Sequence, residues 1–371
     1  MEKPKHEIPE FIKGKLEKIV SKLESNCSAE RPLWDSPVFN LRYSNPASNT
    51  TYNLSNSLIL AALAEGEGYA LPYYLTAKQG FAAGMKMEKG TSGSPILLKW
   101  LQKVKLTKTN PDGSESPILD KDGNPREYIK KCERQINVFN LSQFQGKTPE
   151  NLLKNIASSR KHATPAQVSV VLQSLMDTMP TPLTRNISPD GRHNYYIPSQ
   201  DKINIAPKSF FKSDLHEFST LAHEVAHSYG HKDRKNRESL EKYSMDVKYR
   251  AFEELVANLS AQQVIREFNL EMDESSRKDI NQSFAANHES YDYGWAHVGF
   301  AENPQRILEV GELVDQTAGT MIAAIKADLQ KKLELNPELD VPDILKAQVA
   351  TKKENEERYA EKTKSKIKQK R

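Results

Sequence analysis

The sequence is poor in cysteine and has no long hydrophobic run. Its 371 residues include two cysteines, Cys27 and Cys132, whose spacing matches no metal-binding pattern. We expect both thiols to be reduced. The alternative is a single disulfide between the two cysteines. No stretch approaches the roughly 18 apolar residues of a membrane helix, and residues 1–20 lack the apolar segment of a secretory signal. These absences argue against disulfide-rich and membrane-spanning classes and predict a cytoplasmic globular protein.

Charge is unevenly distributed along the chain, although the total is only +4. Residues 1–146 carry a net charge of +4 and residues 346–371 carry +6, so the residues between them carry −6. Basic segments attract polyanions such as nucleic acids, whereas an acidic segment does not. Because the length also suits two domains, we divide the chain into domains at 1–146 and 147–335 and a basic tail at 336–371, helical or disordered.

A lysine-rich stretch with aromatic residues lies in the first predicted domain. Between Lys78 and Lys108 there are seven lysines and one glutamate, with Phe81 and Trp100 among them. Lysines bind phosphates and aromatic faces stack on bases, which together suit single-stranded nucleic acid. The alternative is an exposed basic face over an ordinary core. The pattern of this domain predicts an α+β fold. We expect a helix at 55–64, strand-like segments between 70 and 139, and a turn-rich hairpin tip or insertion at 110–125.

The second predicted domain contains the string His223-Glu224-Val225-Ala226-His227. Histidines four apart lie one turn apart on a helix, so both imidazoles can face one metal ion. Zinc suits imidazole and carboxylate ligands, and Glu224 is placed to take a proton from a water molecule at the metal. The alternative is a plain helix with one buried and one exposed histidine. Ser213 or Asp214 can cap this helix, which we expect to end near Gly230.

A second helix, expected at 248–268, offers the third metal ligand. Its adjacent carboxylates, Glu253 and Glu254, lie beside an apolar face, where an unpaired charge would be costly. We choose Glu254 as the ligand, with Glu253 as the second choice and an exposed glutamate pair as the alternative. Asn258, one turn further on, could orient a ligand histidine. Strand-like runs at 194–197 and 202–205 could form a plain hairpin or the edge strand that holds an extended peptide.

Several separated strings together resemble the ArdC-like antirestriction proteins of conjugative plasmids and other mobile elements. In the N-terminal half the matching residues are Asn45-Pro46, Tyr52, Asn56, Leu58, Leu75-Thr76-Ala77-Lys78-Gln79, Lys89-Gly90 and Val138-Phe139-Asn140-Leu141-Ser142-Gln143. In the C-terminal half they are Tyr195-Tyr196, Leu221-Ala222-His223-Glu224, His227, Gly230-His231, Arg234, Arg237, Glu253-Glu254-Leu255-Val256-Ala257, Asn287-His288, Tyr291 and Trp295. The family commonly has glutamate where this chain has Asn258, and the basic tail has no clear counterpart.

The resemblance implies a fold with an N-terminal domain that binds single-stranded DNA and a mostly helical zincin-like (gluzincin) metallopeptidase domain. It implies that His223, His227 and Glu254 hold Zn²⁺ and that Glu224 is the general base. Candidates for stabilising an oxyanion, by residue type, are His288, Tyr291, Tyr293 and His231. Candidate DNA-binding residues are Trp34, Tyr52, Asn56, Lys78, Lys86, Lys89, Trp100 and Lys103.

Two functions of different class remain open from the sequence. The first is a zinc peptidase held on single-stranded DNA, whose substrate is a DNA-bound protein or peptide. The second is a DNA-binding protection factor that is not an enzyme, with a structural or inactive zinc site. In both, the protein would protect incoming mobile-element DNA from host restriction. The intact Glu224 favours the first, because a structural metal site needs no general base.

Overall fold

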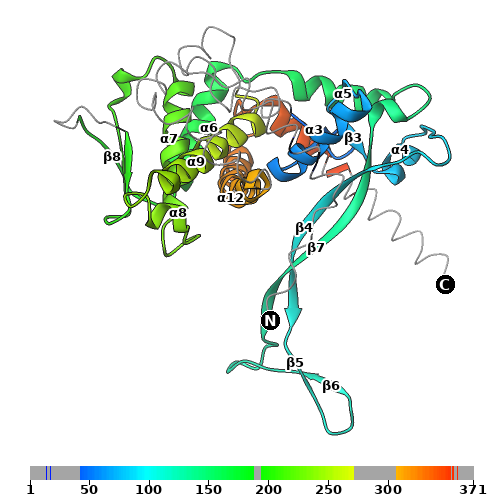
Figure 1. Cartoon of the computed structure of the whole chain (residues 1–371), viewed down its shortest axis with the longest axis horizontal. Coiled ribbons are helices and arrows are strands. Elements are labelled where there is room, and N and C mark those ends of the chain that lie inside the picture. Colours follow the sequence, from blue (N-terminus) through cyan, green and yellow to red (C-terminus); the bar gives the residue numbers. More distant parts are fainter. Residues whose placement is uncertain are drawn as a thin grey trace.

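The computed structural model describes residues 42–187, 194–270 and 306–351, with a few isolated residues outside these ranges. Over these ranges the N-terminal region is rich in strands and the C-terminal region is mostly helical (Figure 1). The α+β class predicted from the sequence is thereby confirmed. Among the described helices, none is both long and apolar enough to cross a membrane.

A three-stranded antiparallel sheet forms the centre of the N-terminal region. Across the sheet its strands are β3 (Tyr74–Leu75), β7 (Glu127–Asn140) and β4 (Ser94–Lys105). The smaller elements around it are β1 (Ser44–Asn45), β2 (Thr50–Thr51), α3 (Leu54–Glu67), α4 (Ala77–Ala82) and a 3-10 turn at Leu141–Gln143. Helix α3 is tied to β4 because the Asn56 amide side chain bonds to both the N–H and the carbonyl of Leu97, at 2.9 Å each.

Strands β4 and β7 extend beyond the body as a long hairpin, which we call the arm (Figure 1). Their pairing runs without a break from Ser94–Val138 at the body to Lys105–Glu127 at the far end. The short strands β5 (Thr107–Thr109) and β6 (Glu115–Pro117) form a second hairpin at the tip. The hairpin tip expected at 110–125 is therefore present.

The C-terminal region is built from helices and a second small sheet. The helices are α5 (Glu150–Arg160), α6 (Pro165–Thr178), α7 (Asp214–Ser228), α8 (Glu238–Glu241), α9 (Val247–Glu267) and α12 (Arg306–Leu335). The sheet contains β8 (Leu183–Arg185), β10 (Lys202–Ile205) and β9 (Tyr195–Ile197), with β10 in the middle, and a 3-10 turn follows at Lys208–Phe210. Helix α6 is capped by Thr164, which forms a capping box with Gln167, and Pro165 occupies the first helical position between them.

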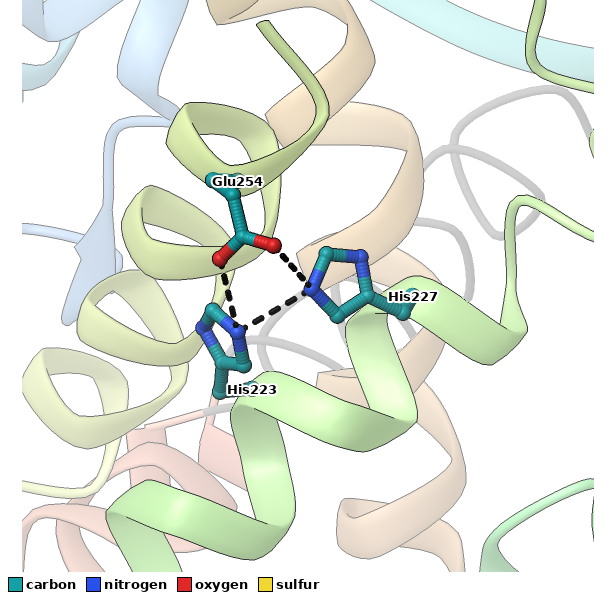
Figure 2. A group of neighbouring side chains, drawn as sticks. All are labelled: His223, His227 and Glu254. Atoms are coloured by element: carbon teal, nitrogen blue, oxygen red, sulfur yellow. Dashed lines mark hydrogen bonds and ion pairs between the residues drawn. The ribbon is translucent and has the colours of Figure 1, made fainter. Parts of the chain in front are cut away.

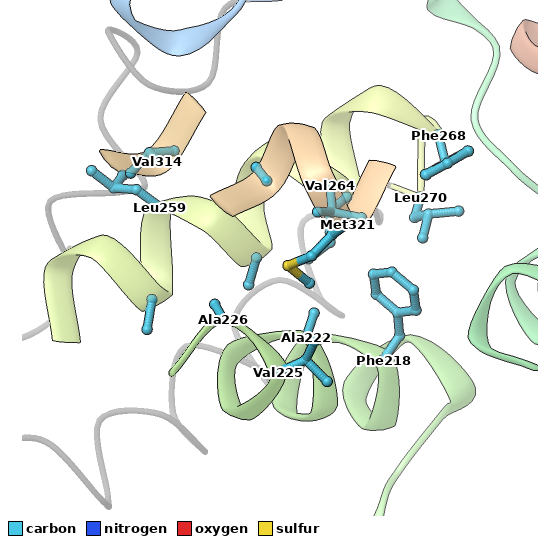
Figure 3. Close-up of a cluster of buried hydrophobic side chains, with 14 of the residues drawn as sticks. Phe218, Ala222, Val225, Ala226, Leu259, Val264, Phe268, Leu270, Val314 and Met321 are labelled. Atoms are coloured by element: carbon cyan, nitrogen blue, oxygen red, sulfur yellow. The ribbon is translucent and has the colours of Figure 1, made fainter. Parts of the chain in front are cut away.

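Helices α7, α9 and α12 meet in the main hydrophobic core (Figure 3). Phe218 of α7, Val264 of α9 and Met321 of α12 are all at most 1% exposed. Burying one such side chain stabilises the fold by roughly 1.5–3 kcal/mol. This core holds α7 and α9 rigidly against each other, which matters because the histidines and the paired glutamates lie on these two helices.

The same core crosses both domain boundaries predicted from the sequence. Leu54 and Leu58 of α3 belong to it together with the C-terminal helices, and so do Val341 and Leu345, which lie beyond α12. Residues 343–351 are helical, so the first part of the predicted tail is packed rather than free. The division at 146/147 and 335/336 stays a prediction. The N-terminal region also has two smaller hydrophobic clusters beside the shared core, one around Leu75 and one around Tyr74.

A carboxylate from the C-terminal region caps the first turn of α3. The backbone N–H groups of Leu54 and Ser55 donate to the two oxygens of Asp315 in α12, at 2.6 and 3.2 Å. The first N–H groups of a helix have no partner inside it, so this contact satisfies two donors at once. It joins the two regions by hydrogen bonds in addition to the shared core.

We predict that Asp315→Ala lowers the free energy of unfolding by about 1–2 kcal/mol, because two helix donors lose their acceptor. Asp315→Asn keeps one acceptor and should cost less. Urea unfolding at neutral pH measures both, with Gln316→Ala at the exposed neighbouring position as the control. Equal stability of Asp315→Ala and the wild type would contradict this role.

Candidate metal centre

Helix α7 carries both histidines of the HExxH string in its buried second half. Ser213 begins the helix, because its side chain accepts the N–H of His216 at 3.1 Å. Ser213, rather than Asp214, is therefore the cap. His223 and His227 are 3% and 6% exposed, so the reading with one buried and one exposed histidine does not apply.

The two imidazoles and Glu254 of α9 converge on one point (Figure 2). One ligand atom from each of the three residues lies within 4.8 Å of the others. The Nε2 atoms of His223 and His227 are 3.0 Å apart. The Glu254 oxygens lie 3.3 Å from Nε2 of His223 and 3.5 Å from Nε2 of His227. The sequence prediction of a His-His-Glu group is thus met by the geometry.

These separations suit a small divalent ion. Zinc bonds of about 2.0–2.1 Å at tetrahedral angles place neighbouring ligand atoms about 3.4 Å apart. The two Nε2 atoms are 3.0 Å apart, and each lies 3.3–3.5 Å from one of the two Glu254 oxygens. Two imidazole nitrogens and one carboxylate oxygen are also the donor types that zinc takes. The residues therefore fit a candidate divalent-metal site.

The neighbouring carboxylate, Glu253, points to the other side of His227. Its Oε1 lies 3.1 Å from Nδ1 of His227, so a proton on Nδ1 leaves Nε2 free to bind a metal. Arg237 donates from Nε to Glu253 at 2.9 Å, and Ser239 donates from its hydroxyl at 2.6 Å. Glu254 completes the metal group, and Glu253 orients one of its histidines.

Electrostatics make this group of side chains attractive to a cation. Burial opposes a charge on His227, but the carboxylates of Glu254 and Glu253 outweigh it and raise its pKa to about 10. Burial likewise opposes a charge on Glu253, yet Arg237 and His227 lower its pKa to about 2. For Glu254, the two histidines overcome the cost of burial and lower its pKa well below the ordinary value. Two buried carboxylates thus favour positive charge at His227.

Glu224 lies beside the metal group and touches the small sheet. It is 7% exposed, and burial raises its pKa, while the charges of His223 and His227 act in the opposite direction. Its carboxylate accepts the backbone N–H of Tyr196. Tyr196 belongs to β9, the outer strand of the sheet order β8-β10-β9. An edge strand therefore passes next to the expected general base.

Arg234 fixes this strand relative to α7. It donates from Nε to the carbonyl of Ser228 at 2.7 Å and from Nη1 to Asp201 at 2.9 Å. Asp201 lies in the β9–β10 turn and accepts the Tyr196 hydroxyl at 2.8 Å. The end of α7 and the edge strand are thus held by one guanidinium group.

Tyr243 is a residue of the site that the sequence analysis missed. Its hydroxyl donates to Oε1 of Glu254, and its ring meets the edge of the His227 ring at a centroid distance of 6.3 Å. Burial and the Glu254 charge raise its pKa. Tyr243 lies between α8 and α9, outside any periodic pattern, so the sequence carried no signal for it.

The remaining predicted residues of this region divide into three groups. Asn258 is buried one turn after Glu254, and its role in orienting a histidine stays a prediction. His231 lies after α7, where its Nδ1 faces Asp233 at 3.5 Å. His288, Tyr291 and Tyr293 lie outside the described residues.

The predicted DNA-binding residues are found in different surroundings. Asn56 is buried in its contact with β4, and the Tyr52 hydroxyl donates to the carbonyl of Tyr74 at 3.1 Å. Both therefore have structural roles. Trp34 lies outside the described residues. The exposed candidates are Lys78, Lys86, Lys89, Trp100 and Lys103.

We predict a graded loss of zinc affinity in this site. Glu253→Gln should weaken binding about 10–100-fold, because His227 loses its charged partner. His223→Ala and Glu254→Gln should weaken it further, since each removes a donor atom. Competition with a coloured zinc chelator measures all three. His231→Ala, four residues beyond His227, is the matched control and should bind like the wild type. An equal loss in that control would contradict the assignment.

Comparison with known families matches two parts of the chain. Residues 11–139 match the N-terminal domain of anti-restriction factor ArdC. Residues 176–301 match a zincin-like metallopeptidase. The second match contains His223, His227 and Glu254, so it covers the candidate metal site.

Individual proteins give further similarities. The chain is 30% identical over 200 residues to an Escherichia coli protein named DNA primase TraC, covering 52% of this chain and 17% of that protein. It is 24% identical over 262 residues to the uncharacterized protein y4eC of Sinorhizobium fredii, covering 69% of this chain and 76% of that one. It thus spans only a small part of the primase.

One solved structure resembles the fold as a whole. The metal-free crystal structure of the antirestriction ArdC protein from plasmid R388 superimposes with a TM-score of 0.52 at 21% identity, over 86% of this chain and 98% of that one. At this identity the likeness concerns the fold. The two family matches lead to one conclusion: the chain is an ArdC-like antirestriction protein, with an ArdC N-terminal domain and a zincin-like metallopeptidase domain.

Proposed function

We propose that this protein binds single-stranded DNA through its N-terminal region and hydrolyses peptide bonds at a zinc centre. Its role would be to protect incoming mobile-element DNA from host restriction, and its substrate would be a protein or peptide bound to that DNA. The observation that carries the enzymatic part is the position of Glu224, buried next to the convergent group His223, His227 and Glu254. The similarity in fold to the antirestriction ArdC protein of plasmid R388 supports the proposed biological role.

In this proposal each residue has a separate task. A bound Zn²⁺ would supply Lewis-acid activation of a water molecule and of the scissile carbonyl. His223, His227 and Glu254 hold the ion, and Glu253 keeps the ring of His227 in the required tautomer. Glu224 accepts the proton of the attacking water on its carboxylate and later gives it to the leaving amine.

The edge strand β9 supplies a place for the substrate. Its outer side has no strand partner among the described residues, since the sheet order is β8-β10-β9. An extended peptide can pair with such an edge through main-chain hydrogen bonds. Because Tyr196 of this strand donates to Glu224, a peptide beside β9 would lie close to the general base.

The competing function is a DNA-binding protection factor without enzymatic activity. A structural zinc site has four protein ligands, whereas a catalytic one has three and leaves a position open. Within the described residues the metal group has three members. This count and the buried Glu224 favour the peptidase.

We predict that Glu224→Gln keeps zinc and loses cleavage by at least about 100-fold, because the shape remains while the proton acceptor is lost. The assay measures zinc content and hydrolysis of fluorescein-labelled casein by the full chain. Glu217→Gln is unsuitable as a control because Glu217 pairs with Arg185. Glu241→Gln, at an exposed position, is the better one. Zinc-loaded wild type that never cleaves would favour the competing function.

We also predict that the full chain binds a single-stranded oligonucleotide more tightly than the same sequence as a duplex. Its affinity should fall as salt rises, because lysines release counterions from the phosphates. The whole chain is required, since α3 shares its core with the C-terminal helices. Fluorescence anisotropy at two salt concentrations measures both effects. Equal affinity for both forms of DNA would contradict the proposed preference.

A further inference from the structure

The arm is the long hairpin of β4 and β7 in Figure 1. Its two faces differ in chemistry, and the strand register assigns each residue to one of them. Residues paired directly across an antiparallel ladder share a face, and successive residues alternate between faces. The pairs Leu98–Arg134, Trp100–Cys132, Gln102–Lys130 and Val104–Tyr128 therefore lie on one side, which we call the aromatic face. The pairs Lys99–Glu133, Lys103–Ile129 and Lys105–Glu127 lie on the other side, the lysine face.

The aromatic face continues a buried surface beyond the point where the chain covers it. On the same side of the ladder, nearer the body, lie Ile96 and Val138, which are 4% and 1% exposed in a core cluster with Leu60 of α3. Further along the same face, Leu98, Trp100 and Tyr128 are 43%, 42% and 45% exposed. A line of large, exposed apolar side chains is typical of a binding surface.

Cationic and aromatic side chains alternate along this face. From the body outward the order is Arg134, Trp100, Lys130 and Tyr128, by the register of the pairs. The two rings lie four residues apart, or about 14 Å along the strands. None of the eight residues of the aromatic face is acidic. A surface of this kind attracts phosphates and offers two separate flat rings.

The lysine face has more lysines but a less favourable arrangement. Lys99 lies opposite Glu133, and Lys105 lies opposite Glu127. Lys99 also contacts Glu312 of α12 at 3.2 Å. Nearby carboxylates weaken the attraction of a lysine for phosphate, and this face carries no aromatic ring among these pairs.

We propose that the aromatic face of the arm is the surface on which single-stranded DNA is held. Bases stack on Trp100 and Tyr128, while Lys130 and Arg134 bind the phosphates between and beside them. Only unpaired bases expose their faces to such rings, so the surface selects single strands over duplex. This inference rests on the proposed DNA binding and assigns it to one side of one hairpin. It also excludes Lys103, one of the candidate DNA-binding residues, because Lys103 lies on the lysine face.

Three variants of the full chain test the assignment against a fluorescein-labelled 20-residue oligothymidine. Trp100→Ala with Tyr128→Ala should weaken binding at least tenfold, because each stacked ring carries much of the affinity. Lys130→Ala with Arg134→Ala should weaken binding and reduce the slope of log affinity against log salt by about 1.4. Lys103→Ala with Lys105→Ala is the control with the same loss of charge on the lysine face, and should change affinity less than threefold.

A conservative substitution separates stacking from structural damage. Trp100→Phe keeps a ring at the same site and should retain most of the affinity that Trp100→Ala loses. Circular dichroism and zinc content should be unchanged in every variant, because all the altered side chains are at least partly exposed.

Two results would overturn the proposal in different ways. If the wild type binds the oligonucleotide and Trp100→Ala with Tyr128→Ala binds it equally well, the aromatic face is not the site, although DNA binding stands. The same follows if the lysine-face control loses as much affinity. If the wild type does not bind single-stranded DNA, both this assignment and the proposed DNA-binding function are wrong.

Discussion

The buried contact between Glu253 and Arg237 is the interaction on which the metal centre depends. Arg237 bonds to Glu253 of α9, to the carbonyl of Ala226 in α7 at 2.8 Å and to Thr317 of α12 at 3.0 Å. Removing one partner of such a pair costs roughly 3–5 kcal/mol, because the other charge stays buried. Gly230 makes room for it: a Cβ there would lie 2.8 Å from the guanidinium. One side chain thus sets the spacing of three helices and, through Glu253, the orientation of His227.

This arrangement explains why two adjacent glutamates occur on α9. Neighbouring residues of a helix point about 100° apart, so a pair cannot serve the same side of one ligand. Glu254 lies on the Nε2 side of both imidazoles, whereas Glu253 lies on the Nδ1 side of His227. The negative charge of Glu253 is balanced by Arg237, which leaves the charge of Glu254 available for a metal ion.

The sequence predicted the parts of the site that follow from helical period. His223 and His227 are four residues apart, which predicts that they share one helix face. Glu254 lies beside the apolar face of the second helix, which made it a candidate third ligand. The sequence favoured Glu254 over Glu253 but could not exclude Glu253, because either carboxylate could face α7. Tyr243 and Arg237 belong to irregular segments, whose path depends on packing between distant elements. The strand-like patterns between 94 and 139 were visible as well, but only the register of β4 and β7 assigns their side chains to faces.

The shared core also limits how gene segments that encode such proteins can recombine. Two recognisable sequence segments would ordinarily suggest units that recombine freely. Here Leu54 and Leu58 of the first segment are completed by α12 of the second, and Asp315 caps the helix that carries them. A gene fragment encoding the strand-rich part alone would expose that apolar helix face to water. Recombination between related genes should therefore keep both segments together. Otherwise it must exchange α3 and α12 for two helices whose surfaces fit each other.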